Sequence, residues 1–288
     1  MRTFVRLSLL RVASSIASSN LDSLPPPPLT LVACIMSGHA GAVLCVNILY
    51  AASTVVVSGG GEGGIRLWEP QSGVCMAELS GHKAAVSCLH SSGREILSGS
   101  RDRAVHLWDP ESKDPGPLAI FRGHTSWLRH VQFKGAHLLV SSSSDRTLRV
   151  WDRRAPTAAV ASLCANDAPL TCFSTSRGSN PTLVSGTADG AVKVWDLRAH
   201  DTAVQTLAGH TGAVSALHRD RCHVLSAGAD GIVREHVMGS GALSYEHTGH
   251  SGAVTSMGAT QTSVVTCSWD HTIRLWKRRS PPSGALTI

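Results

Sequence analysis

Apolar and polar residues alternate in short runs along most of the chain, and turn residues separate the runs. Residues 85–122 show this clearly, with the successive segments AVSCLH, SSGRE, ILSGS, SRDRA, VHLWD and PLAIFR. The first, third, fifth and sixth alternate with a period of two, which predicts short β-strands, whereas SSGRE and SRDRA are turns. No segment keeps a helical period for more than a few residues, so the pattern predicts an all-β protein.

This four-strand unit recurs six times. A Gly-His pair opens five copies, at Gly38-His39, Gly81-His82, Gly123-His124, Gly209-His210 and Gly249-His250, and the fourth copy has Ala165-Asn166 instead. Four copies end in Trp followed by an acid, and the fifth and sixth end in His236-Val237 and Trp276-Lys277. The ends, at positions 68, 108, 151, 195, 236 and 276, lie 40 to 44 residues apart, and an acid stands six residues before each. Because one small sheet cannot cover both of its faces, the units must stack on one another.

The period, the Gly-His start, the acid of the turn and the Trp-Asp end resemble the WD40-repeat family over about residues 30 to 288. The resemblance implies a β-propeller of four-stranded antiparallel blades, of which six are recognisable. It also implies a buried hydrogen-bonded network in each blade, built from the His, a Ser or Thr, the acid and the Trp. The residues that match this network are His82, Asp102, Trp108, His124, Asp145, Trp151, Asp189, Trp195, His250, Asp270 and Trp276. Since they recur with the repeat, we expect them to be structural rather than catalytic.

How the ring closes is left open by the sequence. In this family the chain usually enters on the outer strand of the last blade, and Leu29–Met36 fits that role. Gly284–Ile288 also resembles the start of an outer strand, so six sets of inner strands face seven candidate outer strands. Either the ring has six blades and one end is surplus, or it has seven and one blade is decayed or missing. We expect six ordered blades.

The N-terminal segment differs from the rest of the chain. Residues 1–24 contain three arginines and many serines but no acid before Asp22, a composition typical of a mitochondrial transit peptide. A disordered tail, a start-site error and a decayed blade are the alternatives. Pro25 to Pro28 form a stiff spacer, so we expect a segment 1–28 followed by a propeller domain over 29–288.

The composition excludes several classes of protein. With 42% hydrophobic and 16% charged residues the chain is globular, and its net charge of +6 is not gathered into a basic stripe that would favour nucleic acid. The uncharged stretch Gly41–Val57 is broken by polar residues, so no membrane span is expected. Eight cysteines without a CxxC pair indicate reduced thiols in a cytoplasmic or nuclear protein.

Motifs for catalysis or cofactors are weak. Gly59 to Gly64 match GxGxxG, but a strand-like segment, IRLWE, follows where a dinucleotide site needs a helix. No nucleophile elbow, Walker A loop or HExxH helix occurs. We therefore expect a non-enzymatic protein with no catalytic residues, metal site or cofactor; a propeller enzyme is the least favoured alternative.

Two loop surfaces are candidates for protein or peptide binding. In a meander the Gly-His loop and the acidic turn share one face, here called the top face. Exposed Trp and Arg residues are typical of binding hot spots, and the top-face candidates are Arg101, Arg103, Trp127, Arg146, Trp269 and His271. The alternative is that the two tryptophans cover blade junctions.

The opposite face carries two WDxR sequences, which include Trp151, Asp152, Arg154, Trp195, Asp196 and Arg198. They resemble the box by which WD40 substrate receptors dock on the adaptor of cullin-RING ubiquitin ligases. An Arg fork suits pairing with a partner's carboxylate, although it also suits pairing with its own Asp. The sequence thus predicts an interaction scaffold. It is either a ligase substrate receptor or a subunit of another assembly, such as one in RNA processing, trafficking or signalling.

Overall fold

The computed structural model describes residues 35–50, 54–112, 114, 116–164, 168–175, 181–198, 203–207, 209–260 and 262–278. Within these ranges the regular structure consists of 23 β-strands. None of the described residues lies in a helix, so none belongs to a helix that is long and apolar enough to cross a membrane. The all-β fold predicted from the alternating pattern is confirmed.

The strands form six sheets of consecutive strands, which we call blades 1 to 6. Blade 1 contains β1 (Val43–Tyr50), β2 (Thr54–Gly60), β3 (Ile65–Trp68) and β4 (Cys75–Leu79), and blade 2 contains β5 (Val86–Ser92), β6 (Glu95–Ser100), β7 (Ala104–Trp108) and β8 (Ala119–Arg122). Blade 3 contains β9 (Leu128–Lys134), β10 (Leu138–Ser143), β11 (Thr147–Asp152) and β12 (Ala159–Cys164), and blade 4 contains β13 (Leu170–Thr175), β14 (Thr182–Thr187), β15 (Val192–Asp196) and β16 (Gln205–Leu207). Blade 5 contains β17 (Val214–Arg219), β18 (His223–Gly228), β19 (Val233–Val237) and β20 (Leu243–His247), and blade 6 contains β21 (Val254–Ala259), β22 (Ser263–Ser268) and β23 (Ile273–Lys277).

Each blade is an antiparallel meander in which sequence neighbours pair. In blade 3, Leu139 of β10 lies opposite Phe133 of β9 and Trp151 of β11. The first strand of every blade is paired with an irregular register, as between Val86 and Cys88 in β5. Such bulges increase the twist of a strand, which suits the innermost position of a propeller blade.

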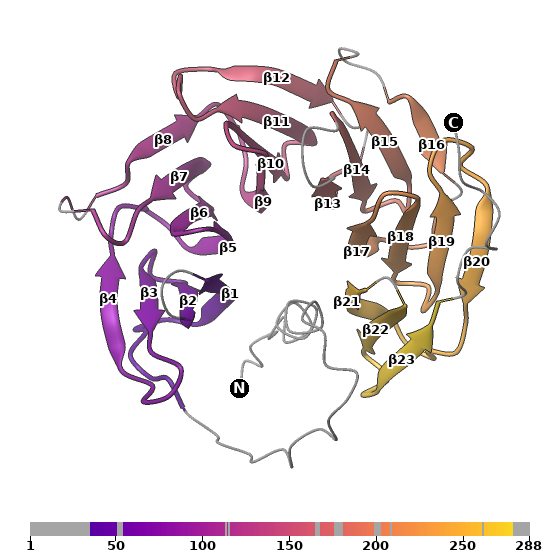
Figure 1. Cartoon of the computed structure of the whole chain (residues 1–288), viewed down its shortest axis with the longest axis horizontal. Coiled ribbons are helices and arrows are strands. Elements are labelled where there is room, and N and C mark those ends of the chain that lie inside the picture. Colours follow the sequence, from indigo (N-terminus) through magenta and orange to yellow (C-terminus); the bar gives the residue numbers. More distant parts are fainter. Residues whose placement is uncertain are drawn as a thin grey trace.

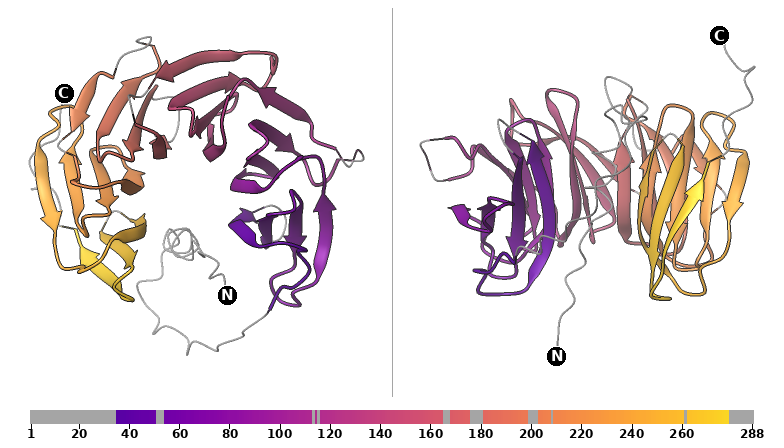
Figure 2. Two further views of the ribbon diagram at one scale, coloured as in Figure 1. Left: turned by 180° about the vertical axis from the view of Figure 1, so that it is seen from behind. Right: turned by 60° about the horizontal axis from the view of Figure 1, so that its bottom comes forward.

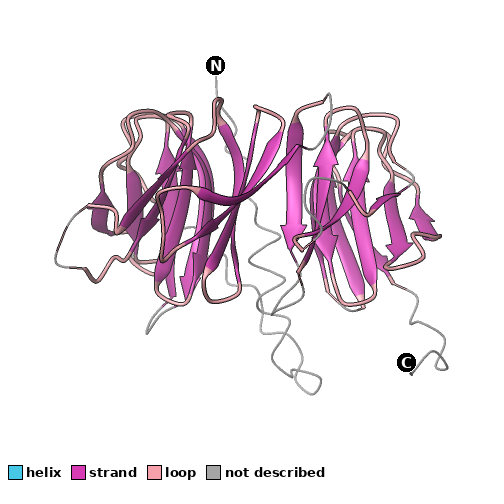
Figure 3. Ribbon diagram, turned by 90° about the horizontal axis from the view of Figure 1, so that it is seen from above, coloured by secondary structure: helices cyan, strands magenta, loops and turns pink. Residues whose placement is uncertain are grey.

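The blades are arranged around a common centre, as Figure 1 shows, with β1, β5, β9, β13, β17 and β21 innermost. Figure 2 shows the same order from behind and in a tilted view. Seen edge-on in Figure 3, the strands run between two rims of loops. One rim carries the Gly-His loops and acidic turns, and is the top face. The other carries the Trp-Asp ends of the third strands, and we call it the bottom face.

The hydrophobic core lies between successive blades. Val105 and Leu107 of blade 2 are 1% and 3% exposed, since they pack against blade 3 residues that include Leu139 and Trp151. Similar clusters join the other consecutive blades. Each buried aliphatic side chain contributes about 1.5–3 kcal/mol when it leaves water, so most of the stability comes from stacking rather than from any single sheet.

Polar contacts fasten the same junctions. Ser87 Oγ of blade 2 lies 2.7 Å from the carbonyl oxygen of Leu128 in blade 3. On the bottom face, the guanidinium of Arg153 in blade 3 pairs with Glu95 in blade 2. Arg278, which follows blade 6, pairs in the same way with Asp220 of blade 5 at 2.8 Å. These contacts fix the relative position of neighbouring blades.

The six predicted blades are confirmed, but the described residues do not form a continuous ring. Figure 1 shows an opening between blade 1 (β1–β4) and blade 6 (β21–β23). Blade 6 has three strands among the described residues. Of the predicted closing segment Leu29–Met36, Ile35 and Met36 are not in a strand, and residues 29–34 lie outside the described residues, as do residues 1–28 and 284–288.

Candidate protein-interaction surfaces

The repeated His, Ser, acid and Trp residues lie together in the blades where all four occur. In blade 2, His82 Nδ1 lies 2.9 Å from Asp102 Oδ2, and His82 Nε2 lies 2.7 Å from Ser98 Oγ. The indole N–H of Trp108 donates to the same Ser98 oxygen at 2.7 Å. The chain of bonds runs from the acidic turn on the top face to the buried Trp, so it joins the Gly-His loop, β6 and β7 of one blade.

Blades 3 and 6 repeat this geometry, with His124–Asp145 at 2.8 Å and His250–Asp270 at 2.7 Å. In blade 4, Trp195 donates to Ser185 at 2.8 Å, while Asp189 accepts from Thr187; Asn166, at the His position, lies outside the described residues. In the first copy, Glu62 replaces Asp and still bonds to His39.

Blade 5 departs from the pattern. His210 bonds to Asp230 at 2.9 Å and to Ser226 at 2.9 Å, as elsewhere. His236, however, takes the place of Trp and is fully buried, and neither of its ring nitrogens has a hydrogen-bond partner among the described residues. Because the imidazole ring of His236 is smaller than the indole ring of Trp, the network of this blade is incomplete.

The acids of the network are held in the ionised form. Burial by itself raises the pKa of Asp102, but the hydrogen bonds from His82 and from the N–H of Lys83 outweigh this, so the net pKa is lowered. Asp145 and Asp270 have lowered pKa values through the corresponding bonds. An ionised acid that accepts several hydrogen bonds stiffens the turn that carries it, which gives the top face a rigid base.

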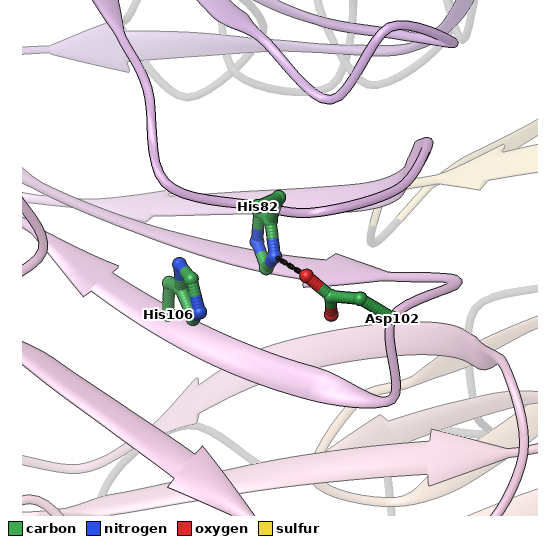
Figure 4. Close-up of side chains that lie close together, drawn as sticks. All are labelled: His82, Asp102 and His106. Carbon is green, nitrogen blue, oxygen red and sulfur yellow. Dashed lines mark hydrogen bonds and ion pairs between the residues drawn. The ribbon is translucent and has the colours of Figure 1, made fainter.

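His82, Asp102 and His106 are the one group of three potential metal ligands among the described residues, and Figure 4 shows them. Both nitrogens of His82 are already bonded, to Asp102 and to Ser98. The rings of His82 and His106 stack, with centroids 3.8 Å apart and planes at 10°. Parallel rings direct their lone pairs side by side instead of toward a common point, so the arrangement does not suit a metal ion.

His106 occupies a position where the other blades carry a cation. The matching residues, two before the Trp position, are Arg66, Arg149, Lys193, Arg234 and Arg274. In blade 5, Arg234 reaches Asp230 at 2.8 Å. His106 is 1% exposed, and burial together with the nearby His82 lowers its pKa to about 3. The ring is therefore neutral at pH 7, and blade 2 lacks the cation of the other blades.

Four of the six predicted top-face residues lie on neighbouring blades. Arg101 and Arg103 are in the β6–β7 turn of blade 2, Trp127 precedes β9 of blade 3, and Arg146 is in the β10–β11 turn of blade 3. All four are exposed, Trp127 by 49%, and the guanidinium carbon of Arg101 lies 4.8 Å from the centre of the Trp127 ring. Trp127 is therefore on the surface, and Arg101 packs on it as in a cation–π pair.

The turns of this region have an unusual backbone. Arg103 and Arg146 have φ angles of 71° and 70°. The matching residues of blades 1, 4 and 5 are glycines, which adopt this left-handed conformation without strain. A residue with a side chain pays about 1–2 kcal/mol there, so blades 2 and 3 keep their arginines at a cost to stability.

The remaining top-face candidates lie elsewhere. Trp269 is 69% exposed and His271 has a φ of 65°, but both belong to blade 6, which Figure 1 places across the ring from blades 2 and 3. Sequence reasoning missed Arg129, which is exposed and donates to Ser144 at 2.7 Å. It lies two residues after Trp127, and this short separation in the sequence could have revealed it.

The two WDxR arginines lie on the bottom face of adjacent blades. Arg154 Nη2 is 2.6 Å from Asp152, and Arg198 Nη2 is 2.7 Å from Asp196, so each guanidinium binds the acid of its own loop. Hydrogen bonds from Arg154 hold the pKa of Asp152 at about 2. The arginine side chains remain 66% and 76% exposed. Trp151 and Trp195 are buried, so of the predicted docking residues only the Asp–Arg pairs face solvent.

Comparison with known proteins finds similarity to parts of larger proteins. The chain is 31% identical over 167 residues to "Protein SPA1-RELATED 3" of Arabidopsis thaliana, which is 57% of this chain and 19% of that protein. It is 31% identical over 147 residues to "Ribosome biogenesis protein WDR12 homolog" of Nematostella vectensis, which is 49% of this chain and 35% of that protein. A short segment of 33 residues is 52% identical to "Nuclear distribution protein PAC1" of Eremothecium gossypii, and covers 7% of it. The chain thus spans well under two thirds of the length of these relatives.

The repeats themselves match one family. The WD40 family, described as "WD domain, G-beta repeat", matches residues 31–69, 73–109, 115–152, 158–196, 201–235 and 241–277. These six matches cover most of the chain and agree with the six blades. WD40 propellers generally act as interaction scaffolds and not as enzymes, and nothing in the described network departs from a structural role. On its repeats, its blades and the hydrogen-bonded network within them, this chain belongs to the WD40 family.

Proposed function

We propose that the protein is a non-catalytic interaction scaffold that binds an acidic segment of a partner protein on the top face of blades 2 and 3. The binding surface consists of Arg101, Arg103, Trp127, Arg129 and Arg146, which we call the top-face cluster. The observation that carries the proposal is the exposed Trp127 ring with the Arg101 guanidinium packed on it. Trp and Arg are the residues most enriched among binding hot spots.

The charge of the cluster favours an acidic partner. Four arginines are exposed there, while the acids of the same turns, Asp102 and Asp145, are engaged by the histidines of their own blades. A guanidinium presents a planar fork that binds carboxylates with two parallel hydrogen bonds. The arginines therefore select for negative charge, and the Trp ring supplies apolar contact.

The rigidity of the blades supports the same function. The residues of the cluster are attached to turns that the His82–Asp102 and His124–Asp145 bonds hold in place. Binding to a surface that is already ordered loses little conformational entropy. The strained φ angles of Arg103 and Arg146 favour a functional reason for keeping side chains where glycine would be stable.

A second candidate function uses the bottom face. Arg154 and Arg198 occupy equivalent, exposed positions of adjacent blades, which favours docking on a cullin-RING ligase adaptor, with the top face then selecting the substrate. Such docking requires each arginine to release the Asp of its own loop and to bind an acidic residue of the adaptor instead. Exposed ion pairs are weak enough for this exchange. The alternative is a scaffold in another assembly, which the similarity to a ribosome biogenesis protein favours. Either role places the protein in the cytoplasm or the nucleus.

Affinity capture with three purified forms of the full chain tests both candidates. The forms are the wild type, Trp127→Ala/Arg129→Ala and Arg154→Ala/Arg198→Ala. Equal thermal midpoints of the three serve as the folding control, because all four side chains are exposed. A partner that only the top-face variant loses supports the main proposal. Cullin and adaptor lost only by the bottom-face variant support the ligase role, whereas identical capture by all three forms refutes both.

A further inference from the structure

Blade 3 carries Arg129 at a position where other blades use a hydroxyl to fasten a junction. The second residue of the innermost strand in blades 2, 4, 5 and 6 is Ser87, Thr171, Ser215 and Thr255, respectively. Ser87 donates to the Leu128 carbonyl of the next blade at 2.7 Å, and Ser215 donates to the Val254 carbonyl at 2.5 Å. Arg129 is exposed instead. A side chain that replaces a stabilising contact and faces solvent favours a role in binding.

Trp127 also departs from the repeat. The residue before the innermost strand is small or Pro in the other blades, at Ala42, Ala85, Pro169, Ala213 and Ala253. In all six blades the carbonyl oxygen of this residue accepts a hydrogen bond from the turn between the second and third strands. The position is therefore fixed equally in every blade, and blade 3 alone adds a large apolar ring to it.

The Trp127 ring lies across the junction between two turns that carry arginines. Its backbone carbonyl accepts the N–H of Ser144 at 2.9 Å, in the blade 3 turn that contains Arg146. Its ring contacts the guanidinium of Arg101, in the blade 2 turn that also contains Arg103. Arg101 and Arg103 therefore lie on the blade 2 side of an exposed apolar ring, and Arg146 lies on the blade 3 side.

Arg129 adds a second cation on the blade 3 side. Its Nε donates to Ser144 Oγ at 2.7 Å, so the side chain is held against the turn that carries Arg146. The top-face cluster thus has two arginines from each blade, with Trp127 between the pairs. Such an arrangement suits a ligand that has an apolar group in the middle and a negative charge on either side.

We infer that the partner binds as an extended segment across the junction of blades 2 and 3, with an apolar residue on Trp127 and an acidic residue two positions before and two positions after it. The inference rests on the proposed function of the top-face cluster and specifies the sequence pattern of the partner. In an extended chain, alternate side chains point the same way and repeat about every 7 Å. The three side chains therefore face the cluster together, one acid toward each blade.

This pattern is more selective than negative charge alone. Acids directly next to the apolar residue point away from the surface that the apolar residue contacts, because neighbouring side chains of an extended segment lie on opposite faces. A segment with the same composition but adjacent acids should therefore bind more weakly. A general attraction between arginines and carboxylates would not distinguish the two.

Three labelled peptides with blocked ends test the pattern by fluorescence anisotropy with the full chain. The pattern peptide is GSESLSESG, the isomer with adjacent acids is GSSELESSG, and the peptide without the apolar residue is GSESSSESG. The pattern peptide should bind about tenfold more tightly than either of the others, because each of them loses contacts on one part of the cluster. Trp127→Ala should abolish the preference for the pattern peptide over the peptide without Leu.

Charge exchange tests which blade each acid meets. Arg103→Glu and Arg146→Glu reverse one charge on blade 2 and on blade 3, respectively, and both residues are exposed, so the thermal midpoints should stay close to that of the wild type. The two variants should prefer opposite members of the peptide pair GSKSLSESG and GSESLSKSG. Arg154→Glu, an equal reversal on the bottom face, is the control and should bind all peptides as the wild type does.

The outcomes separate this inference from the proposed function. If the pattern peptide and its isomer bind equally well, and Trp127→Ala/Arg129→Ala weakens both, the pattern is wrong but the acidic partner remains supported. The same preference in Arg103→Glu and Arg146→Glu, or no preference in either, overturns the placement across two blades. Binding of none of the peptides also overturns the inference, and the affinity capture described above then decides on the proposed function independently.

Discussion

Trp108→Ala should destabilise the protein far more than His236→Ala, although the two residues hold the same position in their blades. Both side chains are buried, at 1% and 0% exposure. Trp108 packs against blade 1 and donates its indole N–H to Ser98 at 2.7 Å. His236 has no hydrogen-bond partner for either ring nitrogen among the described residues. The two substitutions therefore remove very different interactions.

The magnitudes follow from these contacts. Replacing a buried Trp by Ala costs about 3–5 kcal/mol through lost burial and the cavity left behind. The His236→Ala change also leaves a cavity, but it removes a polar ring that is buried without hydrogen bonds. That burial destabilises the wild-type folded state by about 1–3 kcal/mol. The two effects nearly cancel, so His236→Ala should change the free energy of unfolding by about 1 kcal/mol or less. In a protein of this size, about 4 kcal/mol corresponds to a fall in thermal midpoint of roughly 8–16 °C.

Calorimetry and urea unfolding of wild type, Trp108→Ala and His236→Ala measure the difference. Trp195→Ala is the matched control in blade 4, because Trp195 is also 1% exposed and bonds to Ser185 at 2.8 Å. It should resemble Trp108→Ala. Equal losses for Trp108→Ala and His236→Ala would refute the argument that the completed network, and not the position itself, stabilises a blade.

Three further changes test other features of the blades. His236→Trp should raise the thermal midpoint, because the indole N–H would reach Ser226, ten residues earlier as in the other blades; an unchanged or lower midpoint would show that the site has repacked around the smaller ring. The pKa of His106 is lowered to about 3, so below pH 6.5 the unfolded chain takes up a proton at this residue that the folded chain does not. The free energy of unfolding therefore decreases as the pH is lowered. His106→Arg should reduce the loss of unfolding free energy between pH 7 and pH 5 by about 2 kcal/mol, measured by urea unfolding at both values, and an identical loss in both proteins would contradict this assignment. Arg103→Gly should raise stability by about 1 kcal/mol by relieving the left-handed backbone, while it weakens capture of the partner; a fall in stability would mean that the turn is not strained.

Much of the fold was predictable from the sequence, because the period-two alternation and the recurring Gly-His and Trp residues are local signals. They predict strands, turns and the number of blades, and the family match and the six sheets confirm these. The incomplete network of blade 5 was also visible, since His236 stands where Trp is expected. Local spacing did not show that His106 stacks on His82, because that contact depends on how two strands face each other.

The sequence by itself determined the type of sheet, the number of repeats and the residues that fasten each blade, because one repeat contains all the partners of its own network. Only the tertiary structure decided which side chains meet solvent. Arg101 packs on Trp127 although 26 positions separate them, and Arg154 and Arg198 bind their own acids. Exposure of Ile273 and Leu275 depends on whether a neighbouring blade is present, which no residue within the repeat encodes. The sequence pattern of a repeat predicts the contacts within that repeat, whereas contacts between blades depend on the arrangement of the whole ring.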